Sequence, residues 1–189
     1  MRIVAGRHRG RRLAAIGAGD PRGQLRPTSD RLRESLFNRL MHGGEGDAVT
    51  GARVLDLFAG TGALGLEALS RGAARAVFVD NGRAARRLIA ANIAALDETA
   101  RARLIAADAT RLGPAPEAAF GLILLDPPYG KGLGERALGR ALDGGWIVPG
   151  ALIVWEEGAE ITPPPGLTLL DSHRHGDTVL NFLRAAAPG

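Results

Sequence analysis

The chain has 189 residues and a formal net charge of +4, with 46% hydrophobic and 23% charged residues. This composition is typical of one globular domain and excludes a disordered tail, a collagen and a long coiled coil. The chain contains no cysteine, which excludes disulfides, thiolate zinc sites and a cysteine nucleophile. No apolar run reaches the roughly 18–20 residues of a membrane span, and the N-terminus lacks the apolar core of a secretory signal. We therefore expect a cytoplasmic protein with no membrane contact.

Positive charge is concentrated at the N-terminal end. Residues 1–33 contain nine arginines and two aspartates, a net +7, so the remaining 156 residues carry −3. Basic arms of this kind are typical of segments that contact phosphate backbones. A GC-rich genome would favour arginine over lysine, but it would not explain the clustering. We expect nucleic-acid contacts from Arg2, Arg7, Arg9, Arg11, Arg12 and Arg26.

In chain order, the pattern predicts an N-terminal arm and one larger domain. Residues 1–27 are expected to form a basic β-hairpin, from the alternating stretches 2–5 and 10–14, followed by a connector rich in glycine and proline. Residues 28–189 are expected to form the larger domain. It should begin with a helix that Thr28 or Ser29 caps and that Gly43 and Gly44 end.

The larger domain then alternates between apolar strands and helices. Helices are expected at 63–71, 83–96 and 134–142, and strands at 53–58, 76–79, 103–106, 120–125, 151–156, 167–171 and 178–184. Near-continuous apolar strands that alternate with helices predict an α/β fold, with a parallel sheet covered on both faces.

A glycine-rich loop follows the first of these strands. Gly60, Gly62 and Gly65 form a G-x-G-x-x-G pattern, and Asp80 ends the next strand about 20 residues later. The glycines let backbone amides approach a ligand, and the aspartate can accept both hydroxyls of a ribose. The pattern alone fits NAD or S-adenosylmethionine.

Two further aspartates favour S-adenosylmethionine. Asp56 would repel a pyrophosphate but suits a cationic amino acid, and Asp108 can accept a hydrogen bond from an adenine amino group. Each aspartate could instead be a helix cap, but three of them end successive strands, at the edge where open α/β sheets bind ligands. The expected cofactor-binding residues are Asp56, Phe58, Gly60, Thr61, Gly62, Asp80, Asp108 and Ala109.

The fourth strand ends in Asp126-Pro127-Pro128-Tyr129. The prolines stiffen this loop, so the Asp126 carboxylate and the Pro127 carbonyl can both accept hydrogen bonds from one NH₂ group. Tyr129, the only tyrosine, offers a flat face on which a base can stack. These contacts would pull the amine nitrogen towards tetrahedral geometry and stabilise the positive charge that grows there during methyl transfer. We therefore expect Asp126, Pro127 and Tyr129 to be catalytic, although a strand-ending turn with a buried tyrosine could have the same sequence.

Three blocks of sequence together resemble the RsmD family of methyltransferases. They are residues 1–6 with Arg26-Pro27-Thr28 and 31–38, residues 55–62 with 64–73, and Leu125-Asp126-Pro127-Pro128-Tyr129. The resemblance implies the class I S-adenosylmethionine methyltransferase fold, with seven strands in a mostly parallel sheet. It also implies S-adenosylmethionine as methyl donor and N2 of a guanine in 16S ribosomal RNA as target, within the 30S subunit or a late assembly intermediate. Asp56 and Gly60 would lie at the methionine end, Asp80 at the ribose and Asp108 at the adenine.

The residues alone are also compatible with other functions. A DNA adenine methyltransferase would share residues 126–129, but the chain has no room for a separate target-recognition domain. An NAD-linked oxidoreductase would explain the glycines but not that turn, and a non-catalytic RNA-binding protein would need a broken cofactor pocket. The turn could also hold adenine N6 or cytosine N4 as the amine that accepts the methyl group. We expect a monomer without a metal, and the four histidines are expected at surface or loop positions (His8, His42, His173, His175).

Overall fold

The computed structural model of the chain describes residues 1–15 and 29–187. The helices are α1 (Asp30–His42), α2 (Ala63–Ser70), α3 (Arg83–Ala95) and α4 (Leu133–Asp143), with a short 3₁₀ helix η1 (Ala109–Arg111). The strands are β1 (Arg53–Leu57), β2 (Arg75–Val79), β3 (Ala102–Ile105), β4 (Phe120–Leu125), β5 (Ile147–Glu157), β6 (Leu167–His175) and β7 (Thr178–Ala185).

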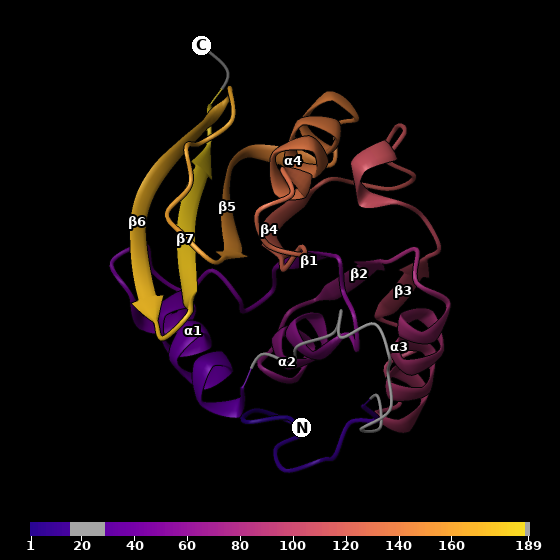
Figure 1. The fold of residues 1–189 in the computed structure, drawn as a ribbon. Helices are drawn as coiled ribbons and strands as arrows, with labels where there is room; N and C mark the ends of the chain where they lie inside the picture. Colours follow the sequence, from indigo (N-terminus) through magenta and orange to yellow (C-terminus); the bar gives the residue numbers. More distant parts are fainter. Residues whose placement is uncertain (16–28, 188–189) are drawn as a thin grey trace.

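The seven strands form one sheet in the order β3-β2-β1-β4-β5-β7-β6. Strands β1 to β5 are parallel, and β7 is antiparallel to both of its neighbours. Figure 1 shows α1, α2 and α3 on one face of the sheet and α4 with η1 on the other. The α/β prediction and the seven-stranded, mostly parallel sheet are thus confirmed.

The register aligns the carboxyl ends of the central strands. Leu57 at the end of β1 pairs with Val79 on one side and with Leu125 on the other. Leu125 in turn pairs with Trp155 of β5. The residues that follow these positions therefore emerge side by side at one edge of the sheet: Phe58, Asp80, Asp126 and Glu156.

Two apolar layers hold the sheet between its helices. One contains Leu36 and Phe37 of α1 with residues of α2 and α3, and the other contains Leu138 of α4 with Phe120 and Trp155. Strands with apolar side chains on both faces are the expected partners for such layers. Across the two described ranges, no helix is long and apolar enough to cross a membrane.

The expected elements agree closely with the structure, except in the part of the sheet from β5 onward. Helix α1 is capped by Ser29, whose side chain accepts the N–H of Leu32 at 3.1 Å, and it ends at Gly43. Strand β5 begins at Ile147 rather than 151, because a register shift lets the strand pass through Pro149 and Gly150. Strand β6 continues through polar residues to His175, since an edge strand paired with β7 needs no buried face there.

The N-terminal arm differs from the expected hairpin. Residues 1–15 contain one antiparallel bridge, between Arg2 and Arg12, and no strand. Hydrogen bonds from Ile3 N–H to Arg11 O and from Gly10 N–H to Ile3 O close the turn. Gly6 and Gly10, with φ of +79° and +81°, lie at the two ends of the turn, and the pairing beyond it is limited to the single bridge. The rest of the expected arm and connector, with Arg22, Arg26 and Thr28, lies outside the described residues.

The arm is packed against the domain. Ile3 is fully buried, and the Glu67 carboxylate of α2 accepts the N–H groups of Val4 and Ala5 at 2.8 and 3.0 Å. His8 is buried as well and pairs with Glu98 at 2.6 Å. His8 thus lies in a loop, one of the two expected positions, but it is buried there rather than exposed, because it packs beside the residues that follow α3.

Candidate active site

Asp56 is the most deeply buried acidic residue at the edge of the sheet. Its Oδ2 accepts the N–H of Gly65 at 2.9 Å, and its side chain is almost inaccessible to solvent. A Cβ on Gly65 would lie 2.4 Å from Phe78 and 3.1 Å from Asp56 Oδ2, which explains the glycine. Burial raises the pKa of Asp56 to about 8, against the effect of the Gly65 hydrogen bond and with a smaller contribution from Asp80.

Asp80 connects the glycine loop to the start of α3. Its Oδ2 accepts the N–H of Gly60 at 2.9 Å, and its Oδ1 accepts the N–H of Gly82 at 2.7 Å. Each carboxylate oxygen has a second lone pair that can accept from a ribose hydroxyl. The geometry is therefore compatible with the expected ribose contact, and it also gives Asp80 a role in shaping the loop.

Asp108 caps η1. Its Oδ1 accepts both the N–H and the hydroxyl of Thr110, at 2.9 and 2.7 Å. The side-chain hydrogen bond from Thr110 is the main cause of a lowered pKa at Asp108, and the charge of Arg136 adds to it. The helix cap, which is the alternative to a ligand contact, is thus present, and a contact with adenine stays a prediction. Ala109 beside it is buried.

Asp126 lies next to Phe58 at the end of β4, as the register of β1 and β4 requires. Its backbone N–H reaches the Leu57 carbonyl at 3.4 Å. Burial raises the pKa of the Asp126 carboxyl well above its usual range, and the carboxylates of Glu156, Asp56 and Glu157 raise it further. The acidic groups of three neighbouring strands therefore converge on one place.

Tyr129 is anchored by its hydroxyl. The hydroxyl donates to Glu156 Oε1 at 2.8 Å and lies 3.1 Å from Thr178 Oγ1. Burial raises the pKa of Tyr129 above its usual range. Sequence reasoning did not identify Glu156 or Thr178. The rule applied to the aspartates would have found Glu156, because it too ends an apolar strand.

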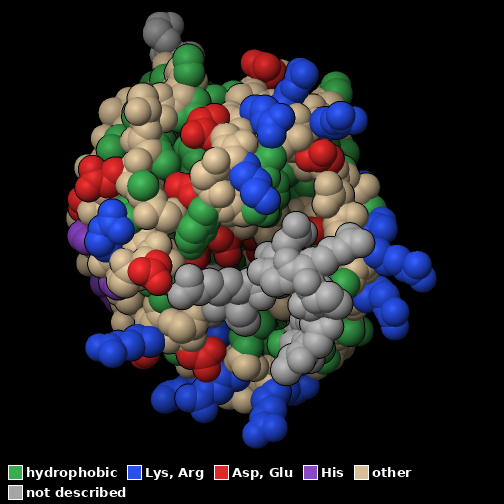
Figure 2. All heavy atoms as spheres, in the orientation of Figure 1, with side chains coloured by type: hydrophobic (Ala, Val, Ile, Leu, Met, Phe, Trp, Pro, Cys, Tyr) green, Lys and Arg blue, Asp and Glu red, His purple; other side chains and the backbone are tan. Residues whose placement is uncertain are grey.

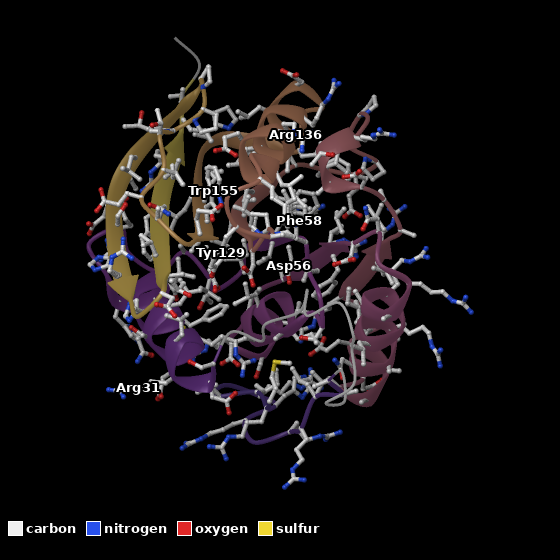
Figure 3. The ribbon with its side chains drawn as sticks, in the orientation of Figure 1. Arg31, Asp56, Phe58, Tyr129, Arg136 and Trp155 are labelled. Carbon is white, nitrogen blue, oxygen red and sulfur yellow. The ribbon has the colours of Figure 1, made fainter. Side chains whose placement is uncertain are left out.

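Phe58 has a backbone conformation that residues other than glycine rarely adopt. Its φ is +57°, in the left-handed region, at the point where β1 meets the glycine loop. Such strain costs about 1–3 kcal/mol and persists mainly at functional sites. Figure 3 shows Phe58, Asp56 and Tyr129 together at the centre of the face that looks along the strand ends. The turn of the chain at Phe58 therefore shapes the centre of the candidate site.

Charge is distributed unevenly over this face. Figure 2 shows a group of acidic side chains near its centre, with arginine or lysine side chains and further acidic side chains around them. Arg31 and Arg136, both exposed, lie on opposite sides of the centre (Figure 3). Within 1–15 and 29–187, no group of three or more histidine, aspartate or glutamate side chains could hold a metal ion.

The five described arginines that were expected to contact phosphates lie on the N-terminal arm, which packs on α2 and α3. Arg7 and Arg9 are exposed on the turn of the arm, and Arg12 is exposed beside it. Arg2 pairs with Asp30 at 3.3 Å, and the Arg11 guanidinium donates to the Ala95 carbonyl at 2.6 Å. The structure therefore sets Asp56, Asp80 and Asp126 at neighbouring strand ends, and it holds the described arm residues on α2 and α3.

Known proteins match almost the whole chain. A family model described as "Conserved hypothetical protein 95" matches residues 1–184. The chain is 39% identical to "Ribosomal RNA small subunit methyltransferase D" of Escherichia coli K12 over 160 residues, which cover 85% of this chain and 76% of that protein. The chain belongs to the RsmD family of methyltransferases. The protein of that name from Haemophilus influenzae is 33% identical over 181 residues, with 93% and 89% of the two chains covered.

The fold agrees with this family. The solved structure of yhhF from Escherichia coli superposes with a TM-score of 0.81 at 34% identity, and covers 100% of this chain and 99% of that one. The resemblance to the RsmD family that the three sequence blocks predicted is thus confirmed, and so is the class I methyltransferase fold.

Proposed function

We propose that the protein transfers a methyl group from S-adenosylmethionine to the exocyclic N2 amine of a guanine in 16S ribosomal RNA. One observation carries the proposal. The register of β1 and β4 sets Asp126 of the Asp-Pro-Pro-Tyr turn beside Phe58 and the glycine loop. An amine held by the turn would therefore lie next to a donor held by the loop.

The acidic edge suits a cationic methyl donor. S-adenosylmethionine supplies an electrophilic methyl group on a positively charged sulfur. Asp56 and Asp126 carry raised pKa values because burial and, to a smaller extent, neighbouring carboxylates oppose their ionisation. A cation at this edge would favour their charged forms. Asp80 would accept the ribose hydroxyls, and Gly60, Thr61 and Gly62 would line the loop around the donor.

The turn would prepare the amine for attack. The Asp126 carboxylate and the Pro127 carbonyl would each accept one N–H of the guanine amine, while the base stacks on Tyr129. Both hydrogen bonds strengthen as positive charge grows on the nitrogen, so they stabilise the transition state more than the ground state. As the amine nitrogen bonds to the methyl carbon, the bond from that carbon to sulfur would break and S-adenosylhomocysteine would leave. The amine proton would then pass to the Asp126 carboxylate that holds it.

The RNA would be held by the arginines of the N-terminal arm. We propose that the exposed Arg7, Arg9 and Arg12, with Arg2, Arg11 and Arg26, contact phosphates, because such contacts release counterions and supply affinity without reading sequence. We further propose a cytoplasmic monomer that acts on the 30S subunit or a late assembly intermediate, where the target nucleotide is held in a defined shape.

Methyl transfer to small-subunit particles tests the function. The purified protein is incubated with labelled S-adenosylmethionine and with 30S subunits from a strain that lacks the corresponding enzyme. We expect N2-methylguanosine in the nucleosides of 16S RNA by mass spectrometry, and none with Asp126→Ala. A product at adenine N6 or cytosine N4 would contradict the target, and binding of NAD but not of S-adenosylmethionine would contradict the reaction.

A further inference from the structure

The end of β5 holds the Asp-Pro-Pro-Tyr turn at two points. Glu156 accepts the Tyr129 hydroxyl at 2.8 Å, and Glu157 Oε1 accepts the N–H of Gly130 at 3.0 Å. The same Glu157 oxygen also accepts the N–H of Gly158, at 2.9 Å. Two consecutive carboxylates thus bind the side chain and the backbone of neighbouring residues in the turn.

The ring of Tyr129 is enclosed on one side and fixed at its far end. A Cβ on Gly158 would lie 3.1 Å from Tyr129 Cδ2, so the backbone that follows β5 packs directly against the ring. Thr178, at the start of β7, lies 3.1 Å from the hydroxyl. The ring is therefore held by contacts from two segments that are not part of the motif, and Tyr129 is only partly buried.

Glu156 itself is firmly placed. Its side chain is 7% exposed, and Glu156 pairs with Leu180 of β7 while the preceding Trp155 pairs with Leu125 of β4. The residue stands beside Asp126 at the level of the strand ends. A buried carboxylate in a sheet interior has less freedom than one on a loop, which makes it a precise anchor.

We propose that Glu156 is a positioning residue for the acceptor base: through the Tyr129 hydroxyl it fixes the plane of the ring on which the base stacks. The inference rests on the proposed function and deepens it. Tyrosine, rather than phenylalanine, is then required at 129, because only its hydroxyl gives the ring a fixed end. In this role Glu156 acts through Tyr129 and needs no contact with the base or the donor.

Positioning matters because the reacting atoms must be aligned. The amine nitrogen has to approach the methyl carbon in line with the sulfur, and a displacement of 1 Å can cost about 100-fold in rate. A base stacked on a tilted ring would present its amine off this line. The expected signature is therefore a loss in kcat for the bound RNA, with the affinity for the donor retained.

Four variants separate positioning from charge. Glu156→Ala and Tyr129→Phe each remove the hydrogen bond, and each should lower kcat by about 10- to 100-fold. The double variant should be no slower than the slower single one, because both remove the same contact. Glu156→Gln keeps an oxygen that accepts the hydroxyl, so it should retain most of the activity. Glu160→Gln, at an exposed position beyond the end of β5, is the matched control and should resemble the unmodified protein.

A spectroscopic measurement reads the ring without any RNA. Tyr129 is the only tyrosine, so protein labelled with ¹³Cζ-tyrosine gives one ring signal. We expect Glu156→Ala to shift this signal towards that of an unanchored phenol, and Glu156→Gln and Glu160→Gln to leave it near its original position. Donor affinity, measured by calorimetry, should stay within about twofold in all variants.

The outcomes are decisive for the positioning role of Glu156. Equal losses in Glu156→Gln and Glu156→Ala would overturn it, because the charge and not the anchor would then matter. Additive losses in the double variant, or an unchanged tyrosine signal in Glu156→Ala, would overturn it as well. If the unmodified protein methylates no small-subunit RNA, the proposed function fails, and the tyrosine signal alone still tests the anchor.

Discussion

The side-chain amide of Asn92 donates a hydrogen bond to the carbonyl oxygen of Thr61 at 2.9 Å, from α3 to the glycine loop. The same side chain accepts the N–H of Ala14 at 2.7 Å and donates to the Ala14 carbonyl at 3.1 Å. Asn92 is 1% exposed. One buried amide therefore connects the glycine loop, α3 and the N-terminal arm.

Replacing Asn92 should weaken both of the segments it connects. Asn92→Ala leaves the Thr61 carbonyl and the Ala14 backbone without these partners, and should lower the free energy of unfolding by about 1–3 kcal/mol. It should also weaken binding of S-adenosylmethionine, because Thr61 belongs to the loop. Asn92→Asp keeps the acceptor for Ala14 N–H but loses both donors, so it should be nearly as harmful. Urea unfolding and calorimetry measure both effects.

The exposed Asn38 of α1 provides the control for this change. Asn38→Ala should alter neither unfolding nor donor affinity, since its contact with Arg71 is long and exposed. If Asn92→Ala binds the donor as tightly as the unmodified protein, the glycine loop does not depend on α3 for its shape.

Donor binding should depend on pH through Asp56. Its pKa of about 8 means that the carboxyl is largely protonated at lower pH in the free protein. Because a cation favours the carboxylate, binding should release protons below this pKa. Affinity should then rise with pH by at most about tenfold per unit and level off above it. Calorimetry in buffers of different ionisation enthalpy counts these protons.

The charge-removing variant identifies the group. Asp56→Asn should bind the donor more weakly at high pH and with little dependence on pH. An unchanged pH dependence in this variant would assign the released protons to another carboxyl, with Asp126 the next to test.

Asp126→Asn should lower the activity and raise the thermal stability. The amide cannot act as the carboxylate does, so turnover should be lost. A carboxyl with a raised pKa in the folded state destabilises the fold as pH rises above its ordinary pKa, because the folded form resists ionisation. The variant should therefore unfold about 2–4 °C higher at pH 8, the shift that roughly 1 kcal/mol produces in a chain of this size.

At pH 4, where the Asp126 carboxyl is largely protonated in the folded protein, the melting temperatures of the variant and the unmodified protein should converge. Thermal unfolding followed by circular dichroism at both pH values checks the prediction. A variant that retains turnover would remove Asp126 from the catalytic residues.

Charge reversal in the arm should weaken RNA binding without affecting the donor. Arg7 and Arg9 are exposed on the turn, and residues 1–15 are anchored through Ile3 and Glu67, so their replacement should leave the fold intact. Arg7→Glu with Arg9→Glu should lower affinity for small-subunit RNA. It should also reduce the slope of log K against log salt by about one for each phosphate that the arm no longer neutralises.

Arg140→Glu, on the last turn of α4, is the matched control for a single reversal. Filter binding at several salt concentrations compares it with Arg9→Glu. Equal slopes in the two variants would show that the arm does not hold phosphates, whatever its net charge.

The strand ends were predictable from the sequence because each depends on local signals. The glycine loop, the prolines after Asp126 and the apolar strands all mark the same edge, and parallel strands bring their carboxyl ends together by topology. Contacts between distant segments left no such signal. In the sequence, Asn92 looks like any other polar residue of a helix, and nothing indicates that its side chain reaches Thr61. Glu156 was detectable, but Thr178 depends on the antiparallel insertion of β7 between β5 and β6.

In the N-terminal arm, the sequence pattern predicted a structure that did not form. Alternation between Arg2 and Ala5 predicted a strand, but tertiary contacts determined its conformation. The Glu67 carboxylate accepts the backbone N–H groups of Val4 and Ala5, within the expected strand, and the Ser70 hydroxyl accepts that of His8 in the turn. Local pattern cannot anticipate a competing acceptor that lies about 60 residues away.

Glu117 should stabilise the amino ends of the strands, and this stabilisation should be lost at low pH. It pairs with Arg75 at 2.5 Å, with Arg53 at 2.7 Å and with Arg103 at 3.2 Å, and so connects β1, β2 and β3. Hydrogen bonding from Arg75, followed by Arg53 and Arg103, lowers the pKa of Glu117 to about 2, although partial burial opposes it. Because the folded pKa is depressed, this stabilisation is present above the ordinary pKa and is lost as pH falls from about 4.5 towards 2.

Glu117→Gln should therefore lower the free energy of unfolding by about 1 kcal/mol at neutral pH, since the arginines are partly exposed and screened. The difference from the unmodified protein should vanish near pH 2. Urea unfolding across this range, with Glu135→Gln on α4 as the control, measures it. A constant difference at all pH values would mean that packing of the side chain, and not its charge, connects the three strands.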